Sequence, residues 1–394
     1  MRSPLADRVI AAAHENGVAF LKRISPNDLG ITGAHQRGYY LPKAVAKFFT
    51  PDLPVRGLNS EHEITIDWSD GHSTSSVVKW YGKAKNEYRI TRYNRIPRFH
   101  YLLPERLGSV LVLVQSDQDR WLGDVLERDD DVDEVLAALG LTLDDSSWAL
   151  YSSEGLAERS SESTSECEKR KIENFAEAQV DFPTTRRMAA AARDVVNSCN
   201  DARVHDVDQA LLELIRVEYD LFRAVERNII RPEITKGFRT VEDFLSLSQT
   251  VLQRRKSRAG RSFEYHLEDL FRSRNVPFES QPMLDGTRPD FVFPSAEAYA
   301  RLDGDADTSG VLVVTVKTTC KDRWRQALAE GPKVSTKYLI TLQQGISQNQ
   351  MREIRAANVK LVVPVDYHEA FAPDDRDSLV SLEDFIQVAE HLTA

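Results

Sequence analysis

Two residues near the C-terminal end of the sequence have the types and the setting for hydrolytic chemistry. Asp290 opens a short apolar run, and Lys317 ends the Val-rich run that follows it. Two adjacent strands would bring this carboxylate and this ammonium to one edge of a sheet. A metal-binding carboxylate beside a lysine that orients water is the minimal equipment for cutting a phosphodiester. We therefore take Asp290 and Lys317 as the candidate catalytic pair.

A second carboxylate is needed, because magnesium usually takes one or two carboxylates together with water and phosphate oxygens. Such an acid is expected two residues before the lysine, but Thr315 occupies that position. An apolar stripe over residues 263–274 predicts a helix, which places Glu264 and Glu268 one turn apart on one face. We predict Glu264 as the second magnesium ligand. Asp290 alone could equally be a carboxylate of a strand-entry turn.

The polar cluster directly after this lysine has the side chains to read DNA bases. Around Trp324 it comprises Lys321, Asp322, Arg323 and Arg325. Arginine can bind guanine O6 and N7 together, and aspartate can accept from cytosine N4, so an Asp-Arg pair suits adjacent C and G bases. The open alternative is the start of an amphipathic helix with surface ion pairs.

A second basic segment lies in the N-terminal half. Residues 79–98 hold seven Lys or Arg residues against Glu87 alone, in a chain whose formal net charge is -10. Phosphate binding is the expected use of such a patch, and a solvated face of a β-ribbon is the alternative. The preceding polar loop adds His35, Arg37 and Tyr40 as residues able to reach DNA.

The overall composition is that of an ordinary globular protein, with 41% hydrophobic and 28% charged residues in 394. The net charge excludes a protein coated in basic residues, although a local field can still bind nucleic acid. We interpret the acidic runs at 127–134 and 154–174 as a solvated face and a linker.

The three cysteines, Cys167, Cys199 and Cys320, are odd in number and lack the spacing of a metal site. They favour a reducing cytoplasm over a disulfide framework. No apolar run approaches the ~18 residues of a membrane span, and no signal-peptide core begins the chain. We expect a cytoplasmic protein without membrane contact or zinc.

The helices and strands that the sequence pattern predicts around these residues indicate an α+β multidomain protein. Short alternating runs indicate a β-rich domain over residues 1–151, and a Ser- and Glu-rich segment indicates a linker at 152–179. Residues 180–394 read as an α/β domain with helices around a small mixed sheet. The predicted N-terminal strands are 19–24, 38–42, 63–68, 76–81, 88–93 and 109–114, with helices at 5–16 and 43–49. The predicted C-terminal helices are 206–225, 241–253, 263–274, 347–357 and 382–392, with strands at 290–293, 311–317, 337–342 and 360–364.

Several stretches resemble the EcoRII-type restriction endonucleases, a family of PD-(D/E)XK nucleases. The most specific is Lys-Thr-Thr-Cys-Lys-Asp-Arg-Trp-Arg, which begins at Lys317. Stretches 257–264, 288–299, 342–347 and 361–364 extend the resemblance in the C-terminal half. Stretches 28–36 and 86–89 carry it into the N-terminal half. Nearly the whole chain is covered.

The resemblance implies roles for single residues. The metal aspartate falls on Asp290, the catalytic lysine on Lys317 and the acid of the preceding helix on Glu264. A tyrosine near the active site falls on Tyr299, and a second lysine falls on Lys321. The family also lacks the acid before the lysine, and its CC/GG-reading element corresponds to residues 321–323. Arg258, in the first resembling stretch, is a further expected DNA contact, as is Arg325.

For the N-terminal half the resemblance implies a pseudobarrel like the plant B3 domains. Its DNA contacts would map to the polar loop and the basic segment, on His35, Tyr40, Lys83, Lys85, Glu87 and Arg89.

The resemblance further implies a homodimeric type IIE enzyme that uses Mg²⁺ to cut both strands of DNA at a CCWGG- or CCNGG-like site. A second DNA copy on the N-terminal domain would relieve autoinhibition, and a DNA cytosine methyltransferase would be the genetic partner. Two alternatives stay open: a catalytically silent DNA-binding regulator, and a nicking or repair nuclease.

Overall fold

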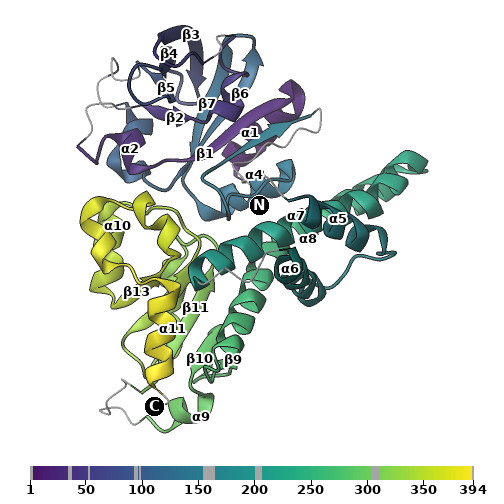
Figure 1. Cartoon of the computed structure of the whole chain (residues 1–394). Helices are drawn as coiled ribbons and strands as arrows, with labels where there is room; N and C mark the ends of the chain where they lie inside the picture. The colour runs from purple at the N-terminus through teal and green to yellow at the C-terminus, as the bar shows by residue number, and fades with distance from the viewer. Residues whose placement is uncertain are drawn as a thin grey trace. The chain divides into compact units, whose positions relative to one another are not determined.

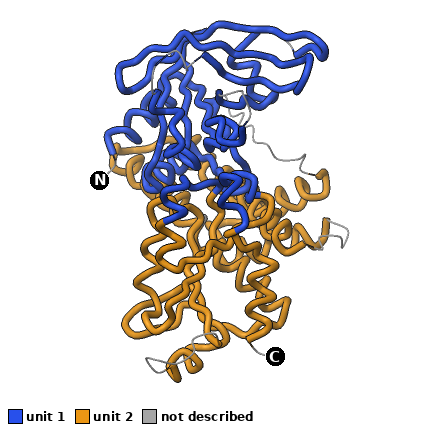
Figure 2. Tube along the Cα trace, turned by 90° about the vertical axis from the view of Figure 1, so that its left-hand side faces the viewer, with its two compact units in different colours: residues 1–160, 344–352, 367–377 blue, residues 161–343, 353–366, 378–394 orange. Residues whose placement is uncertain are grey.

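The chain divides into two compact units (Figure 2). The computed structural model describes residues 3–33, 38–51, 54–92, 96, 99–153, 165–199, 206–302 and 310–392. Unit 1 comprises residues 1–160, 344–352 and 367–377, and unit 2 comprises residues 161–343, 353–366 and 378–394. Among the described residues, no helix is both long and apolar enough to cross a membrane.

Unit 1 is built on an eight-stranded sheet of order β2-β5-β4-β3-β7-β6-β1-β8 (Figure 1). Its strands are β1 (Val18–Arg23), β2 (Tyr39–Leu41), β3 (Asn59–Trp68), β4 (Ser73–Tyr81), β5 (Tyr88–Thr91), β6 (Val110–Asp117), β7 (Arg120–Leu126) and β8 (Trp148–Ser152). Its helices are α1 (Pro4–Asn16), α2 (Pro26–Leu29), α3 (Lys43–Ala46) and α4 (Asp129–Leu139), with short 3-10 turns η2 (His100–Leu102) and η3 (Pro104–Arg106).

Both faces of this sheet are covered at β1 and β6. Alternate residues of β6 enter two different cores: Leu111 and Leu113 join one, while Val110 and Val112 join the other. The second core also takes residues from α1 and α4. Because successive side chains of a strand point to opposite faces, a strand buried on both faces reads as a continuous apolar run. The predicted helix 5–16 and the six predicted strands are present, and β7 and β8 are additional strands.

The acidic run at 127–134, interpreted as a solvated face, is exposed at Glu127, Arg128 and Asp130 but buried at Asp129 and Asp131. Asp129 begins helix α4, and three aspartates occupy its first turn. Acidic side chains stabilise a helix N-terminus through the helix dipole. Val132 and Val135 from the same helix pack into the second core.

Unit 2 contains a group of four helices: α5 (Glu166–Glu177), α6 (Thr185–Cys199), α7 (Val207–Lys236) and α8 (Val241–Ser273). The helices predicted separately at 241–253 and 263–274 are parts of the single helix α8. The polar residues between them interrupt the apolar stripe. Most of these residues have adequate helix propensity but Gly260 does not, so packing such as that of Arg258 over Tyr219 and Phe222 of α7 continues the helix there.

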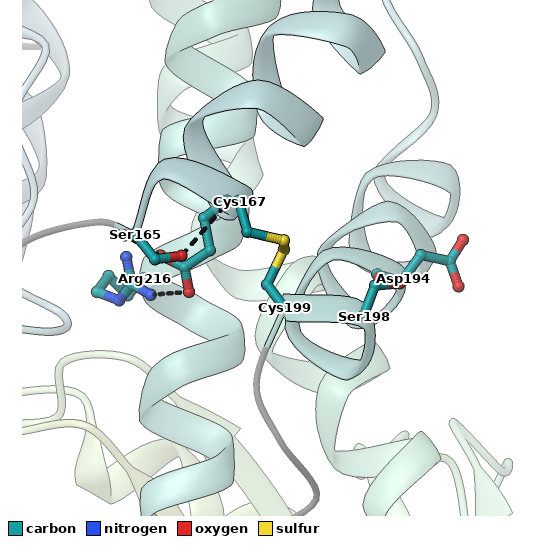
Figure 3. Close-up of a disulfide and its surroundings, with 7 residues drawn as sticks. Ser165, Cys167, Asp194, Ser198, Cys199 and Arg216 are labelled. Carbon is teal, nitrogen blue, oxygen red and sulfur yellow. Dashed lines mark hydrogen bonds and ion pairs between the residues drawn. A yellow bond between two sulfur atoms is a disulfide. The ribbon is translucent and has the colours of Figure 1, made fainter.

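Helix α5 lies within the segment predicted as a linker, and a disulfide ties it to α6 (Figure 3). The expectation of reduced cysteines is therefore wrong for Cys167 and Cys199, whose Cα atoms are 5.6 Å apart. Ser165 caps α5, and Glu168 accepts a hydrogen bond from Arg216 of α7 at 2.8 Å. Ile172 and Ala176 of α5 join the core formed with α6 and α7. The domain boundaries at 151 and 180 stay a prediction.

The second sheet has the order β13-β12-β11-β10-β9. Strands β11, β12 and β13 are parallel, whereas β9, β10 and β11 pair antiparallel. The strands are β9 (Glu279–Ser280), β10 (Phe291–Phe293), β11 (Leu312–Lys317), β12 (Lys337–Thr341) and β13 (Val359–Val362). The remaining helices are α9 (Ala296–Ala300), α10 (Gln348–Ala356) and α11 (Leu382–His391), with 3-10 turns η4 (Trp324–Ala329), η5 (Val365–Ala370) and η6 (Pro373–Ser378).

Aromatic packing fixes helix α8 against this sheet. The ring of Phe271, near the end of α8, lies 5.4 Å from Phe291 and 5.1 Å from Phe293 of β10, measured between ring centroids. Phe385 of α11 packs on Phe293 at 5.5 Å. Edge-to-face aromatic pairs of this kind hold elements at a defined distance. The face of α8 two turns before Phe271 is thereby held beside the start of β10.

Candidate active site

Strands β10 and β11 bring Asp290 and Lys317 together at the same end of the two strands. The two strands pair antiparallel, with Phe291 opposite Val314. Asp290 directly precedes β10, and Lys317 is the last residue of β11. Asp290 Oδ2 accepts a hydrogen bond from the Val316 backbone N–H at 2.6 Å and lies 3.7 Å from Lys317 Nζ.

The electrostatics of Asp290 favour the arrival of a further cation. Burial raises its pKa, and this effect outweighs the lowering by Lys317 and by the Val316 N–H. The carboxylate therefore loses more hydration than its neighbours restore. A perturbed carboxylate of this kind is characteristic of functional sites.

Glu264 joins this pair from helix α8. Its Oε2 accepts a hydrogen bond from Gln281 Nε2 at 2.8 Å. Burial raises its pKa and so does the charge of Asp290, whereas Gln281, Lys317 and Arg261 lower it. The charges of Asp290 and Lys317 therefore both act on Glu264, which associates this helix residue with the pair. The Phe271 contacts described above are what hold α8 in this position.

A third carboxylate at the site, Glu330, was missed by sequence reasoning. Its Oε2 accepts a hydrogen bond from the hydroxyl of Thr315 at 2.5 Å. Burial raises the pKa of Glu330, the Thr315 hydrogen bond lowers it, and the charge of Asp290 raises it further. The residue follows the 3-10 turn η4, so no strand or helix spacing relates it to Lys317. The one available signal was the buried threonine hydroxyl, which needs a partner.

These residues suit a hard divalent cation without forming a closed cage. In the described part of the chain, no three His, Cys, Asp or Glu side chains converge as a ready metal site. Magnesium requires only one or two carboxylates, because waters and substrate phosphates complete its octahedron. Asp290 lies 3.7 Å from Lys317, and the charges of both residues act on Glu264 and on Glu330, so the site can offer the one or two carboxylates that magnesium requires.

Tyr299 lies in α9 and makes contacts with loops rather than with the catalytic pair. Its hydroxyl donates to Asp285 Oδ2 at 2.8 Å and accepts from the Lys333 backbone N–H at 3.1 Å. The side chain is buried. Lys333 belongs to the loop that follows Glu330.

The predicted base-reading residues differ in exposure. Asp322 is exposed, Arg323 is half-buried and Lys321 is buried. Arg325 donates to Glu353 Oε2 at 2.5 Å and lies 4.6 Å from the Trp324 ring. For Arg325 the alternative of a surface ion pair therefore matches the structure. Arg258 is buried over the rings of Tyr219 and Phe222 in the α7–α8 interface.

In the N-terminal half, the basic segment separates into paired and exposed residues. Lys83 and Lys85 are exposed in the turn between β4 and β5. By contrast, Arg89 is buried and donates to Glu87 at 2.9 Å and to the Gly38 carbonyl oxygen at 3.1 Å. Arg89 thus holds the strand entry beside the polar loop. His35 and Arg37 lie outside the described residues.

A buried ion pair, which sequence reasoning also missed, fixes the start of that loop. Asp28 Oδ2 accepts from Lys22 Nζ and from the Ser25 backbone N–H. Its Oδ1 accepts from the Tyr40 backbone N–H at 2.7 Å. Both charged side chains are buried, so each depends on the other for compensation. Tyr40 itself is half-buried, and burial raises the pKa of its hydroxyl.

Comparisons with known proteins cover both halves of the chain. A family model described as EcoRII C terminal matches residues 222–386, and one described as restriction endonuclease EcoRII, N-terminal, matches residues 13–138. The type II restriction enzyme EcoRII of Escherichia coli is 34% identical over 397 aligned residues, covering 96% of this chain and 95% of the relative. The type II restriction enzyme SsoII of Shigella sonnei is 27% identical over 160 residues, covering 38% of this chain and 50% of the relative.

Two solved structures are similar to parts of the chain. Metal-depleted Ecl18kI in complex with uncleaved, modified DNA matches with a TM-score of 0.45 and 19% identity, covering 56% of this chain and 83% of that chain. The UbaLAI restriction endonuclease B3 domain with cognate DNA matches with a TM-score of 0.21 and 22% identity, covering 30% of this chain and 76% of that chain.

The predicted fold class is confirmed, with a β-rich N-terminal half and an α/β C-terminal half that each match a model of one family. The similarity to a full-length enzyme runs through nearly the whole sequence. The chain belongs to the EcoRII family of type II restriction endonucleases and is a site-specific deoxyribonuclease.

Proposed function

We propose that the chain is a Mg²⁺-dependent type IIE endonuclease that cuts both DNA strands at a CC/GG-containing, CCWGG- or CCNGG-like site. The observation that carries this proposal is the cluster of Asp290, Glu264 and Glu330 around Lys317. Asp290 and Glu330 each accept a hydrogen bond from strand β11, through the Val316 N–H and the Thr315 hydroxyl, and Glu264 accepts one from Gln281.

The chain's residues divide the work of hydrolysis. Asp290 and Glu264 would hold the cation, and Glu330 is the additional acid that the structure supports. A bound Mg²⁺ would polarise the scissile phosphate and favour deprotonation of water. Lys317 orients the attacking water and stabilises the negative charge that develops on the phosphate. Water attacks phosphorus in line with the P–O3′ bond, which breaks as the 3′-oxygen leaves and takes up a proton, so the ends carry a 5′-phosphate and a 3′-hydroxyl.

Sequence recognition is assigned to the segment directly after the catalytic lysine. Asp322 and Arg323 would contact cytosine and guanine in the major groove, each good contact giving about 1–3 kcal/mol of discrimination. Lys321 would support the scissile phosphate. The N-terminal half would bind a second DNA copy through Lys83 and Lys85, which are exposed. His35, Arg37 and Tyr40 complete the proposed contacts there.

Autoinhibition has support within unit 1. Gln344, three residues after the end of β12, donates to the carbonyl oxygens of Leu143 and Ser146 at 3.1 Å each. The hydroxyl of Tyr367 donates to the Asp144 carbonyl oxygen at 2.6 Å. The loop at 143–146 is thereby bonded to Gln344, which follows strand β12 in the sequence, and to Tyr367, which follows strand β13. We propose that these bonds hold the closed state and that effector DNA opens it.

Three further proposals concern the enzyme's setting. A chain with one catalytic cluster needs a second copy to cut both strands of a two-fold site, so we propose a homodimer. A cognate DNA cytosine methyltransferase would protect host sites. The enzyme would act in the cytoplasm.

Digestion of a multi-site plasmid tests the proposal. With Mg²⁺ the parent should linearise and fragment the plasmid, while Asp290→Ala and Lys317→Ala should leave it intact. Parental rates for both variants would contradict the catalytic assignment. Site-specific binding without cleavage in Mg²⁺ or Mn²⁺ would instead indicate a silent regulator, and accumulation of nicked circles would indicate a nicking enzyme.

A further inference from the structure

We infer that Tyr299 and Lys337 are positioning residues that hold the loop Gly331–Val334, and through it Glu330, at the active site. This inference rests on the proposed function, since it assumes that Glu330 helps to hold the cation. It differs from the expected role of Tyr299, which was a direct catalytic one.

Lys337 binds both ends of this loop. It is the first residue of β12 and is buried, with 4% of its surface exposed. Its Nζ donates to the carbonyl oxygens of Gly331 and Val334. A buried ammonium is unfavourable unless hydrogen bonds compensate it, and here both named acceptors belong to one short loop. Burial lowers the pKa of Lys337 to about 8.

Tyr299 binds the same loop at Lys333, between the two residues that Lys337 binds. Its hydroxyl accepts from the Lys333 backbone N–H and donates its proton to Asp285 Oδ2. A phenol has a single proton to donate. While Asp285 takes that proton, Tyr299 cannot donate a hydrogen bond to a scissile phosphate, so its hydroxyl serves to hold the loop.

A third contact and a tight backbone complete the constraint. The Gly331 N–H donates to Thr287 Oγ1 at 3.0 Å. Gly331 has φ +55°, and an added Cβ would lie 2.8 Å from Val313 Cγ2 of β11. The loop therefore sits directly on the strand that carries Thr315 and Lys317. Four residues held by three side chains from separate elements form a rigid support for the carboxylate that precedes them.

The decisive experiment separates positioning from direct catalysis. Tyr299→Phe, Thr287→Val and Glu330→Gln are made in the full-length protein, with Tyr338→Phe as the matched control on β12. Single-turnover cleavage is measured against Mg²⁺ concentration. For Tyr299→Phe we expect the half-saturating Mg²⁺ to rise about tenfold, with the rate at saturating Mg²⁺ within about threefold of the parent. Thr287→Val should shift in the same direction, and Tyr338→Phe should behave as the parent.

Three further measurements test the interpretation. Mn²⁺ binding to the DNA-free protein, followed by electron paramagnetic resonance, should weaken in Tyr299→Phe without any need for turnover. In a Glu330→Gln background, Tyr299→Phe should add nothing, because its effect passes through that carboxylate. Lys337→Met should match Tyr299→Phe wherever thermal unfolding shows it folded.

The contrary outcomes are distinct. A lower rate at saturating Mg²⁺ with unchanged half-saturation would overturn the inference and return Tyr299 to a catalytic role. Additive losses in the double variant would overturn it too. If Glu330→Gln itself keeps the parental Mg²⁺ dependence, the proposed role of Glu330 fails. If the parent itself does not cut DNA, the proposed function fails, and Mn²⁺ binding still decides the positioning role.

Discussion

The hydroxyl of Thr315 donates a hydrogen bond to Glu330 Oε2 at 2.5 Å, near the end of the strand that carries Lys317. Thr315 occupies the position two residues before Lys317 where a metal-binding acid is expected. The strand therefore lacks the acid but binds one that comes from the loop after η4. The carboxylate reaches the site from a different element, while the strand supplies its anchor.

This relationship predicts a difference between two substitutions at one position. Thr315→Val removes the hydroxyl and leaves Glu330 without its partner, so we expect weaker binding of the cation and cleavage reduced about tenfold or more at limiting Mg²⁺. Thr315→Ser keeps the hydroxyl and should retain most activity. Cleavage rates over a Mg²⁺ series measure both. Equal rates for the two variants would argue against the anchor.

The raised carboxyl pKa values predict how stability depends on pH. A carboxyl group whose pKa is higher in the folded state stabilises the fold below its unfolded pKa and loses that contribution as the pH rises through the folded value. Above both values the metal-free site therefore destabilises the protein. We expect Asp290→Asn and Glu330→Gln to raise the melting temperature at pH 8, with a smaller gain at pH 5.

Calorimetry on metal-free protein at both pH values tests this expectation. Addition of Mg²⁺ should raise the melting temperature of the parent more than that of either variant, because a cation that binds the folded state stabilises it. The control is Glu233→Gln on α7, which neutralises an exposed carboxylate away from the site. A parental melting temperature for both site variants at pH 8 would contradict the electrostatic reading.

Much of the site could be predicted because it follows strands and one helix. Asp290 begins one apolar run and Lys317 ends the next, and the strands that these runs form pair with each other. Glu264 lies on a predicted helix whose apolar stripe includes Phe263 and Leu267, so the helical periodicity indicated its position. Glu330 could not be found in this way. Its position depends on how a loop folds back over β11, which no repeat in the sequence records. The same limit hid Lys337, a lysine within an otherwise apolar strand.

The fold shows the same division between local and non-local information. The strongly periodic segments, such as α1 and β6, were predicted close to their observed bounds. The join at 254–262 within α8 was missed because packing, and not an apolar stripe, continues the helix there. The pairing of Cys167 with Cys199 depends on how α5 packs against α6, which an odd cysteine count obscured.

The disulfide predicts a response to reducing agents. Closing a loop with a sequence separation of 32 residues should stabilise the fold by about 3–4 kcal/mol, because it restricts the unfolded chain. Dithiothreitol should therefore lower the free energy of unfolding of the parent in urea. The double variant Cys167→Ser/Cys199→Ser should start at the lower value and not respond. An unchanged parental transition would indicate that the bond contributes nothing in solution.

From the contact of Tyr367 with the loop at 143–146 we predict a change in the rate at which DNA with a single site is cleaved. Tyr367→Phe removes the hydroxyl that donates to the Asp144 carbonyl oxygen. A neutral hydrogen bond contributes about 1 kcal/mol. If the bond holds the proposed closed state, its loss should shift the equilibrium between the closed and open states toward the open one by roughly fivefold. Cleavage of single-site DNA should then rise, while cleavage with saturating effector DNA should stay near the parental rate. Tyr151→Phe, which alters another tyrosine of unit 1 bonded to His14, is the control. Equal single-site rates for Tyr367→Phe and the parent would mean that this bond does not hold the closed state.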